Sequence, residues 1–137
     1  MSYKLGAKYI KKNEGYRDLI YKDSLGNLTS GWGHYLRNGS KVPKIVSHIF
    51  FKMDYAKARR EYKLLELTLD SIRKIVIIDL LFNMGIEKVK KFRRMLAALK
   101  VQDFELAGDE LKDSLYYRQA GIRARNNINI LRTGDLV

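Results

Sequence analysis

The sequence predicts a mainly helical α+β protein that carries one small β-hairpin near its N-terminus. Three observations support this prediction. Apolar residues recur at helical spacing over most of the chain. Residues 16–36 have a residue pattern typical of short strands around a turn. Residues 71–84 are apolar on nearly every face of the expected helix. A chain of 137 residues fits one domain, or one core with a small appended lobe.

The residue pattern of the N-terminal part predicts a helix followed by a β-hairpin. The opening residues form a short amphipathic pattern that ends near Gly15, because apolar side chains alternate with lysines at helical spacing. Glu14 therefore falls at the C-terminal end of this helix. The residues after it predict a strand at 19–21, a turn at 24–27 and a return strand from Leu28 onward.

The residue pattern of the remaining chain predicts a series of helices. Pro43 suits the start of a helix over about 44–63. Asp70 is a candidate N-cap for a helix over 71–84, which Gly85 closes, and the apolar faces of that helix predict a buried central position. Further helical patterns follow at about 86–92, 93–100, 102–112 and 122–131.

The composition is strongly basic and free of cysteine. Lys and Arg number 27 against 15 Asp and Glu, so the formal net charge is +12. Such a charge favours a polyanionic partner, which is a nucleic acid, an acidic membrane face or a bacterial envelope, but a solvated basic surface explains it as well. The absence of cysteine leaves the redox compartment open. His34 and His48 are too few for a zinc site, so we expect no metal and no cofactor.

The given residues show no pattern typical of a signal peptide or of a membrane-spanning segment. No apolar stretch approaches the roughly 20 residues that span a bilayer. Residues 1–15 are too charged for a signal peptide. We therefore expect a chain with neither a leader nor a transmembrane segment.

The stretch from Glu14 to His34 carries the residues best suited to catalysis. Cleavage of a glycosidic bond needs one protonated carboxyl, which protonates the leaving oxygen, and one ionised carboxyl, which acts on water or on the sugar carbon. Glu14 lies at a helix end with apolar neighbours, which favour the protonated form that a general acid needs. Asp23 lies beside a solvent-exposed turn, which favours the ionised form that a general base needs. Thr29 on the return strand offers a hydroxyl for the water. Each residue alone also has an ordinary structural explanation, as a helix end, a turn former or a strand residue.

The joint pattern resembles the phage-type lysozymes, the endolysin family of the T-even bacteriophages. The matching positions keep fixed spacing and extend to the central helix and the C-terminal segments. They are Glu14-Gly15, Tyr21-Lys22-Asp23, Gly26, Thr29-x-Gly31-x-Gly33-His34, 81–85, 114–117 and 123–134.

This resemblance implies a lysozyme-like fold for the whole chain. Residues 15–42 are then a β-hairpin lobe, residues 1–14 and 43–137 form a larger helical lobe, and the active-site cleft lies between the lobes. Tyr35 and Phe82 are implied to line the cleft with apolar ring faces.

The implied activity is that of a muramidase, which hydrolyses the β-1,4 bond between N-acetylmuramic acid and N-acetylglucosamine in peptidoglycan. Family members act by inversion. In that scheme Glu14 protonates the glycosidic oxygen, while Asp23 and Thr29 direct water from the opposite face of the ring. Inversion requires carboxyls roughly 6.5–9.5 Å apart.

Supporting residues follow from the same resemblance. His34 is implied to form an ion pair with Asp54. Arg123 matches a family arginine that pairs with Glu14, although a cation beside a carboxyl favours the ionised form and a proton donor must hold its proton. Arg123 can equally serve to hold its helix to the hairpin lobe.

Three further positions depart from the family pattern. Met95 and Glu110 stand at two positions that contact saccharide in the family. Asp79 places a carboxyl inside a mostly apolar helix, with Arg123 or a lysine as a possible partner.

The implied setting is a phage or prophage endolysin. Its partners are peptidoglycan and the anionic envelope, with no nucleic acid and a monomeric state by default. It accumulates in the host bacterial cytoplasm until a holin releases it to the periplasm or cell wall. There it degrades peptidoglycan, and the bacterium lyses.

Two other function classes compete with this interpretation. A basic nucleic-acid-binding domain is favoured by the charge and by the cations of residues 88–94, but it leaves the spacing of Glu14 to His34 unexplained. A catalytically inactive lysozyme-like protein that binds walls or membranes through cationic helices is the second, and the presence of all three catalytic side chains argues against it.

Overall fold

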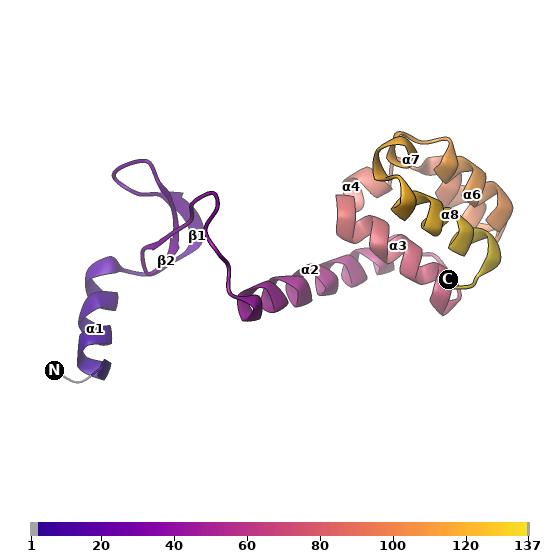
Figure 1. The fold of residues 1–137 in the computed structure, drawn as a ribbon. Helices are drawn as coiled ribbons and strands as arrows, with labels where there is room; N and C mark the ends of the chain where they lie inside the picture. Colours follow the sequence, from indigo (N-terminus) through magenta and orange to yellow (C-terminus); the bar gives the residue numbers. More distant parts are fainter. Residues whose placement is uncertain (1–2, 137) are drawn as a thin grey trace. The chain divides into compact units, whose positions relative to one another are not determined.

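The computed structural model describes residues 3–136, which form helices and one small sheet (Figure 1). Contacts divide the chain into two compact units, Met1–Lys44 and Ile45–Val137. The predicted α+β, mainly helical class is confirmed.

The first unit joins one helix to a three-stranded antiparallel sheet with the order β1-β2-β3. The third strand was not predicted, because it has two residues and follows the glycines of the turn 31–33. Gly31 and Gly33 both have positive φ, of 62° and 71°, which lets the chain reverse over Trp32 and pair again. The elements are α1 (Tyr3–Glu14), β1 (Arg17–Lys22), β2 (Leu28–Gly31) and β3 (His34–Tyr35).

Helix α1 groups with the sheet in this unit. The sequence instead suggests that residues 1–14 belong with the helical lobe, and that assignment stays a prediction. The predicted end of the first helix is confirmed, because Glu14 is the last helical residue and the Gly15 amide donates to the Lys11 carbonyl at 2.9 Å.

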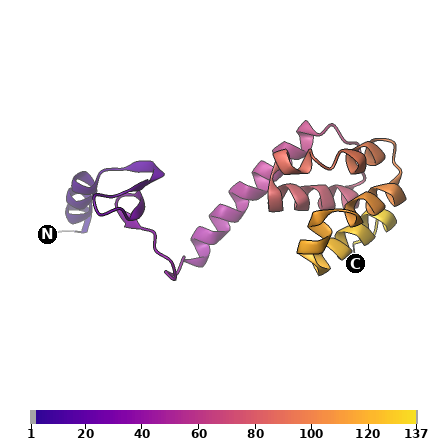
Figure 2. The ribbon, with the colours of Figure 1, turned by 90° about the horizontal axis from the view of Figure 1, so that it is seen from above.

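The second unit is helical throughout (Figure 2). The predicted limits of α3 and α5 are confirmed at both ends, and α4 is shorter than predicted. Helix α7 was missed because it is short, although Ser114 caps it by accepting from the Tyr117 amide. The elements are α2 (Lys44–Leu64), α3 (Ser71–Met84), α4 (Ile86–Val89), α5 (Arg93–Lys100), α6 (Phe104–Lys112), α7 (Leu115–Ala120) and α8 (Ile122–Thr133).

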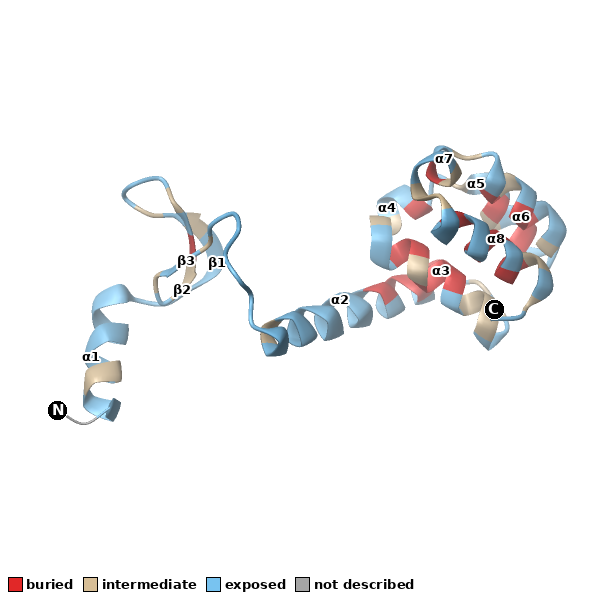
Figure 3. Cartoon of the chain, viewed as in Figure 1, coloured by how far each residue is buried: buried red, intermediate tan, exposed pale blue. Residues whose placement is uncertain are grey.

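The hydrophobic core lies in the second unit and centres on α3, as predicted (Figure 3). Helix α3 contributes five buried side chains and contacts α4 and α8. Asp70 caps it by accepting from the Arg73 amide, and Gly85 ends it. Helices α6 and α8 approach closely at Gly108, where an added Cβ would lie 2.7 Å from the Arg132 side chain. The largest fully buried core side chains are Val76, Ile77, Leu80, Val89, Met95, Leu99, Leu111 and Leu131.

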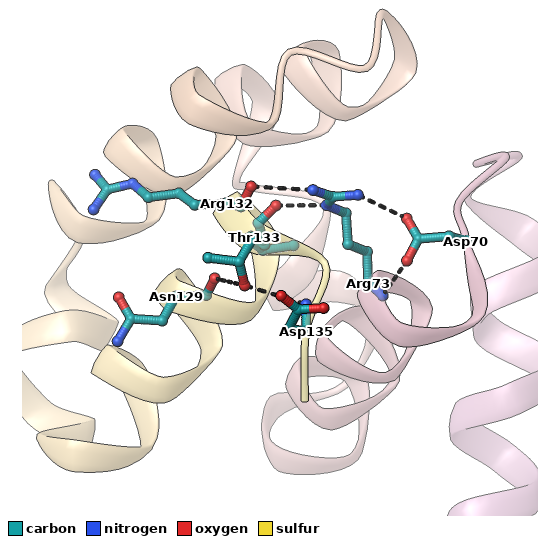
Figure 4. A network of polar contacts seen from close by, with 7 residues as sticks. Asp70, Arg73, Asn129, Arg132, Thr133 and Asp135 are labelled. Carbon is teal, nitrogen blue, oxygen red and sulfur yellow. Dashed lines mark hydrogen bonds and ion pairs between the residues drawn. The ribbon is translucent and has the colours of Figure 1, made fainter. Parts of the chain in front are cut away.

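Arg73 joins the start of α3 to the end of α8 (Figure 4). Its guanidinium donates to the carbonyl oxygens of Leu131 at 2.6 Å and Arg132 at 3.0 Å, and it also pairs with Asp70 at 3.1 Å. The same group stacks on the Phe104 ring at 3.6 Å. A cation at these carbonyls satisfies acceptors that the helix end leaves open and opposes the partial negative charge of the helix dipole.

Arg73→Met is therefore expected to lower the free energy of unfolding by about 2 kcal/mol, because two partly buried carbonyls lose a charged donor while the apolar stem remains. Urea unfolding followed by far-UV circular dichroism measures this. Asp70→Ser is the control, since it keeps a capping oxygen and removes only an ion pair of small value. If Arg73→Met costs no more than Asp70→Ser, the carbonyl contacts do not stabilise the fold.

No helix among residues 3–136 is both long and apolar enough to cross a membrane. The described residues also contain no cluster of His, Asp or Glu side chains with the arrangement of a metal site.

Candidate active site

Glu14 places its carboxyl directly against the backbone of Gly33. A Cβ added to Gly33 would lie 2.4 Å from the Glu14 Oε2 atom and 3.0 Å from its Cδ atom. Only glycine leaves room for the carboxyl at this point, and the positive φ of Gly33 is also one that glycine adopts freely. Within the first unit Glu14 is exposed, and its desolvation by apolar neighbours stays a prediction.

Asp23 is held by the turn between β1 and β2. Its Oδ1 atom accepts from the Asn27 amide at 2.8 Å and from the Leu25 amide at 2.9 Å, and the Asn27 side-chain amide lies 3.4 Å from Oδ2. The Asn27 backbone bond is the main reason that the pKa of Asp23 is lowered. Desolvation, the next largest effect, raises that pKa, and the other amide contacts lower it further. Asp23 is therefore ionised at neutral pH, as the predicted base requires.

Thr29 belongs to the same hydrogen-bonded turn. The Thr29 hydroxyl donates to the Asn27 carbonyl oxygen at 3.0 Å, and the Asp23 amide donates to that same oxygen at 2.8 Å. Thr29 is 4% exposed on the central strand, paired with Tyr21 on one side and Tyr35 on the other. The backbone of Asn27 thus fixes both side chains predicted to direct water, because its amide donates to the Asp23 carboxylate and its carbonyl oxygen accepts from the Thr29 hydroxyl.

Two residues of this arrangement were missed as functional candidates. Asn27 was seen only as a turn residue, although an Asp four positions before an Asn in a glycine-containing turn is a signal for such a side-chain capped loop. Gly33 was seen only as part of the motif. Its role depends on a contact with Glu14 on another element, which local spacing does not reveal.

The first unit carries five of the eight predicted site residues, and the second unit carries the rest. Tyr35 lies beside Thr29 by strand register, and the Arg37 guanidinium stacks over its ring at 5.1 Å. His34 pairs in register with Ser30.

The remaining three predicted residues lie in the second unit. Phe82 is partly exposed near the end of α3, where its ring contacts that of Phe51 with 5.6 Å between centroids. Asp54 lies on α2 and Arg123 on α8. The roles of these side chains in a saccharide site, and the ion pair of His34 with Asp54, stay predictions.

The Asp79 carboxyl has the suggested partner. Arg123 donates to it from Nε at 3.0 Å and from Nη2 at 2.6 Å. The Asn127 side chain donates to Asp79 at 2.8 Å and to the Tyr116 hydroxyl at 3.0 Å. Partial burial raises the pKa of Asp79, but the bonds from Arg123 and Asn127 outweigh burial and the pKa is lowered overall. Pairing of Arg123 with Glu14 stays a prediction.

Comparison with known proteins decides the family. The profile of the Phage lysozyme family matches residues 11–127, which include Glu14, Asp23, Thr29 and Arg123. The chain belongs to the phage lysozyme family. Its α+β architecture agrees with the lysozyme-like fold predicted above.

Curated relatives of this phage lysozyme family member include proteins from a virus and from an amoeba. The chain is 27% identical to "Probable T4-type lysozyme 2" of Dictyostelium discoideum and 28% identical to "Probable T4-type lysozyme 1", with 93% of each chain covered in both cases. It is also 27% identical to "Pre-baseplate central spike protein Gp5" of Enterobacteria phage T4 over 95% of this chain, and it spans 28% of that protein's length.

The lowered pKa of Asp23 gives a direct test of the turn. We expect the Asp23 carboxyl to titrate below its ordinary value of about 3.9 in carbon-detected NMR, because two backbone amides bind the ionised form. The folded pKa is below the unfolded one, so the stabilisation from Asp23 is present above the unfolded value and is lost as pH falls through the folded value. Asn27→Ala removes only the side-chain amide and is expected to move the titration slightly upward. A wild-type value at or above 3.9 would contradict this turn geometry.

Proposed function

We propose that this phage lysozyme family member is a muramidase that cleaves the β-1,4 bond between N-acetylmuramic acid and N-acetylglucosamine in peptidoglycan. The observation that carries the proposal is the geometry of the first unit. A carboxyl seated on Gly33 and a carboxylate fixed by the Asn27 peptide stand at opposite ends of β2. The family relationship supports a peptidoglycan hydrolase of this type.

The Asp23 turn is suited to bind and activate a water molecule. The Thr29 proton is already used on the Asn27 carbonyl, so a water can only donate to the Thr29 oxygen. Such a water would donate its other proton to the ionised Asp23 and keep a lone pair for the sugar carbon. Asp23 then takes the proton as general base when the carbon–oxygen bond forms.

Glu14 is the proposed general acid. Its carboxyl must be protonated when the glycosidic oxygen leaves, so water has to be excluded from this side chain during the reaction. Glu14 protonates the leaving oxygen while the water held by Asp23 and Thr29 attacks from the opposite face of the ring.

Inversion is the proposed stereochemistry, and the separation of the two carboxyls bears on it. The Asp23 turn precedes strand β2 and Gly33 follows it, so the two carboxyls flank this strand. Inverting glycosidases keep their carboxyls roughly 6.5–9.5 Å apart, which leaves room for a water between base and sugar.

The remaining parts of the proposal come from the family resemblance. Tyr35 and Phe82 would offer ring faces to sugars, while His34, Asp54 and Arg123 would support the site. Peptidoglycan and the anionic envelope are the proposed partners. The proposed biological role is lysis of a host wall. In this proposal the protein acts as a monomer after a holin lesion releases it from the cytoplasm.

Product analysis tests the reaction. Purified peptidoglycan is digested with the full chain, the fragments are identified by mass spectrometry, and the anomer of the new reducing end is followed by proton NMR during the first minutes. We expect new N-acetylmuramic acid reducing ends that appear first as the α-anomer. New N-acetylglucosamine ends would contradict the bond assignment, and an initial β-anomer would contradict inversion. Wall binding without any new reducing end would indicate the inactive, cationic wall-binding protein instead.

A further inference from the structure

The Trp32 ring contacts two residues that flank Glu14 along the chain. The Lys11 ammonium, in the last turn of α1, lies 4.2 Å from the centre of the Trp32 ring. The Tyr16 ring, just before β1, lies 4.7 Å from the Trp32 ring between centroids, with an angle of 47° between the ring planes. A cation over an indole face and a tilted pair of rings are both favourable contacts. Trp32 is therefore attached to the chain shortly before Glu14 and again shortly after it.

Gly33, which seats the Glu14 carboxyl, is the residue that follows Trp32. A Cβ added to Gly33 would collide with that carboxyl, so the two groups lie in close contact. Trp32 and Gly33 together form the turn between β2 and β3. The contacts of the Trp32 ring thus hold the end of α1 against the same turn that receives the carboxyl.

The backbone alone does little to hold α1 at this turn. Gly15, Gly31 and Gly33 have positive φ, a region that glycine adopts freely, so the chain has conformational freedom on both sides of the Glu14 contact. Helix α1 makes no close backbone contact with any strand among the described residues. Side chains therefore have to fix where Glu14 lies, and the contacts of Trp32 are suited to do so.

The contact with Trp32 also determines where the Lys11 ammonium lies. Lys11 and Glu14 are three positions apart on one helix, a spacing at which a lysine and a glutamate can form an ion pair. The ion pairs found among the described residues do not include this one. A paired lysine would favour the ionised form of the carboxyl, whereas a general acid must hold its proton. The Trp32 ring thus gives the ammonium a partner other than Glu14.

We propose that Trp32 is a positioning residue for the general acid. Its contacts with Lys11 and Tyr16 hold Glu14 on Gly33, and its ring keeps the Lys11 ammonium away from the carboxyl. Trp32 acts through Glu14 and takes no part in the cleavage of the bond. This inference rests on the proposed function, because it assigns Trp32 to the acid of that reaction.

Steady-state kinetics on soluble glycan chains from peptidoglycan test the positioning. Trp32→Leu removes the ring and keeps an apolar side chain, and it is expected to lower kcat by about 10²-fold with KM nearly unchanged, because the acid is displaced. Trp32→Phe keeps a ring at this position and is expected to retain most of the activity. A higher KM at an unchanged kcat would show that the ring contacts saccharide instead, and would overturn the positioning role.

Tyr9→Leu is the matched control for Trp32→Leu. Tyr9 lies on α1 and has no ring or cation contact among the described residues. Its replacement also exchanges an aromatic ring for leucine in the first unit, and it is expected to keep most of the wild-type activity. Equal losses in Tyr9→Leu and Trp32→Leu would overturn a specific role for Trp32.

Proton NMR of the isotope-labelled full chain gives a readout that does not depend on activity. We expect nuclear Overhauser contacts between the Glu14 side chain and the Gly33 α-protons in the wild type and in Trp32→Phe, and their loss in Trp32→Leu. Tyr16→Leu leaves the indole in place and is expected to weaken the same contacts, so the test does not depend on the folding of one variant. Contacts that persist in Trp32→Leu would overturn the proposal. Lost contacts with unchanged hydrolysis would support the positioning and contradict Glu14 as the general acid, which separates the two proposals.

A second substitution tests the part of the proposal that concerns Lys11. Lys11→Gln combined with Trp32→Leu is expected to be several-fold more active than Trp32→Leu alone, because no ammonium remains to pair with Glu14. Equal activity of these two variants would overturn this part of the proposal.

Discussion

Glu14→Gln is expected to lower peptidoglycan hydrolysis by roughly 10²–10⁴-fold, the range that a general acid contributes. The glutamine keeps the size of the side chain that sits on Gly33, but it cannot deliver a proton to the leaving oxygen. Glu14 is exposed within the first unit, so the free energy of unfolding is expected to change little. Turbidity loss of purified peptidoglycan measures the activity, and urea unfolding measures the stability.

Asp18→Asn is the matched control for this variant. Asp18 is an exposed acid on β1 in the same unit, so its replacement changes the net charge by the same amount. It is expected to keep most of the wild-type activity. A Glu14→Gln protein that retains more than about a tenth of wild-type activity would exclude Glu14 as the general acid.

Gly33→Ala is expected to lower activity by about 10²-fold although residue 33 carries no chemical group of its own. The new methyl would lie 2.4 Å from Glu14 Oε2, so the carboxyl has to move away. A displacement of about 1 Å at a reacting group can cost this much in rate. Turbidity and reducing-end assays under the conditions used for Glu14→Gln give the comparison.

Gly31→Ala separates this displacement from backbone strain. Gly31 and Gly33 both have positive φ, so alanine at either position is expected to cost about 1 kcal/mol of stability. An alanine Cβ at Gly31 meets nothing within 4 Å, whereas at Gly33 it meets Glu14. Similar activities for the two variants would show that the contact between Gly33 and Glu14 does not position the acid.

Features governed by neighbouring residues were predictable. Asp70 was predicted as the N-cap of α3, and the limits 71–84 of that helix were confirmed because capping and apolar patterning act within a few residues. Glu14 was predicted at a helix end, and α1 ends there. The Asp23 turn was predicted at 24–27 for the same reason, since an aspartate before a glycine and an asparagine favours a local side-chain capped turn.

Features that depend on weak local signals were not predicted. Strand β3 has two residues and exists because it pairs with β2, so it leaves little periodic pattern in the sequence. Helix α7 is similarly short, and its Ser114 cap was not recognised.

The sequence by itself determined the α+β class, the main helices, the Asp23 turn and, through its motif, the phage lysozyme family. Only the tertiary structure decided that Glu14 sits on Gly33, that the Asn27 backbone holds both Asp23 and Thr29, and that Asp79 binds Arg123. Asp79 and Arg123 lie 44 positions apart, and that contact forms when the core brings α3 and α8 together. Helix caps and turns need only neighbouring residues, whereas such contacts depend on the packing of the whole unit.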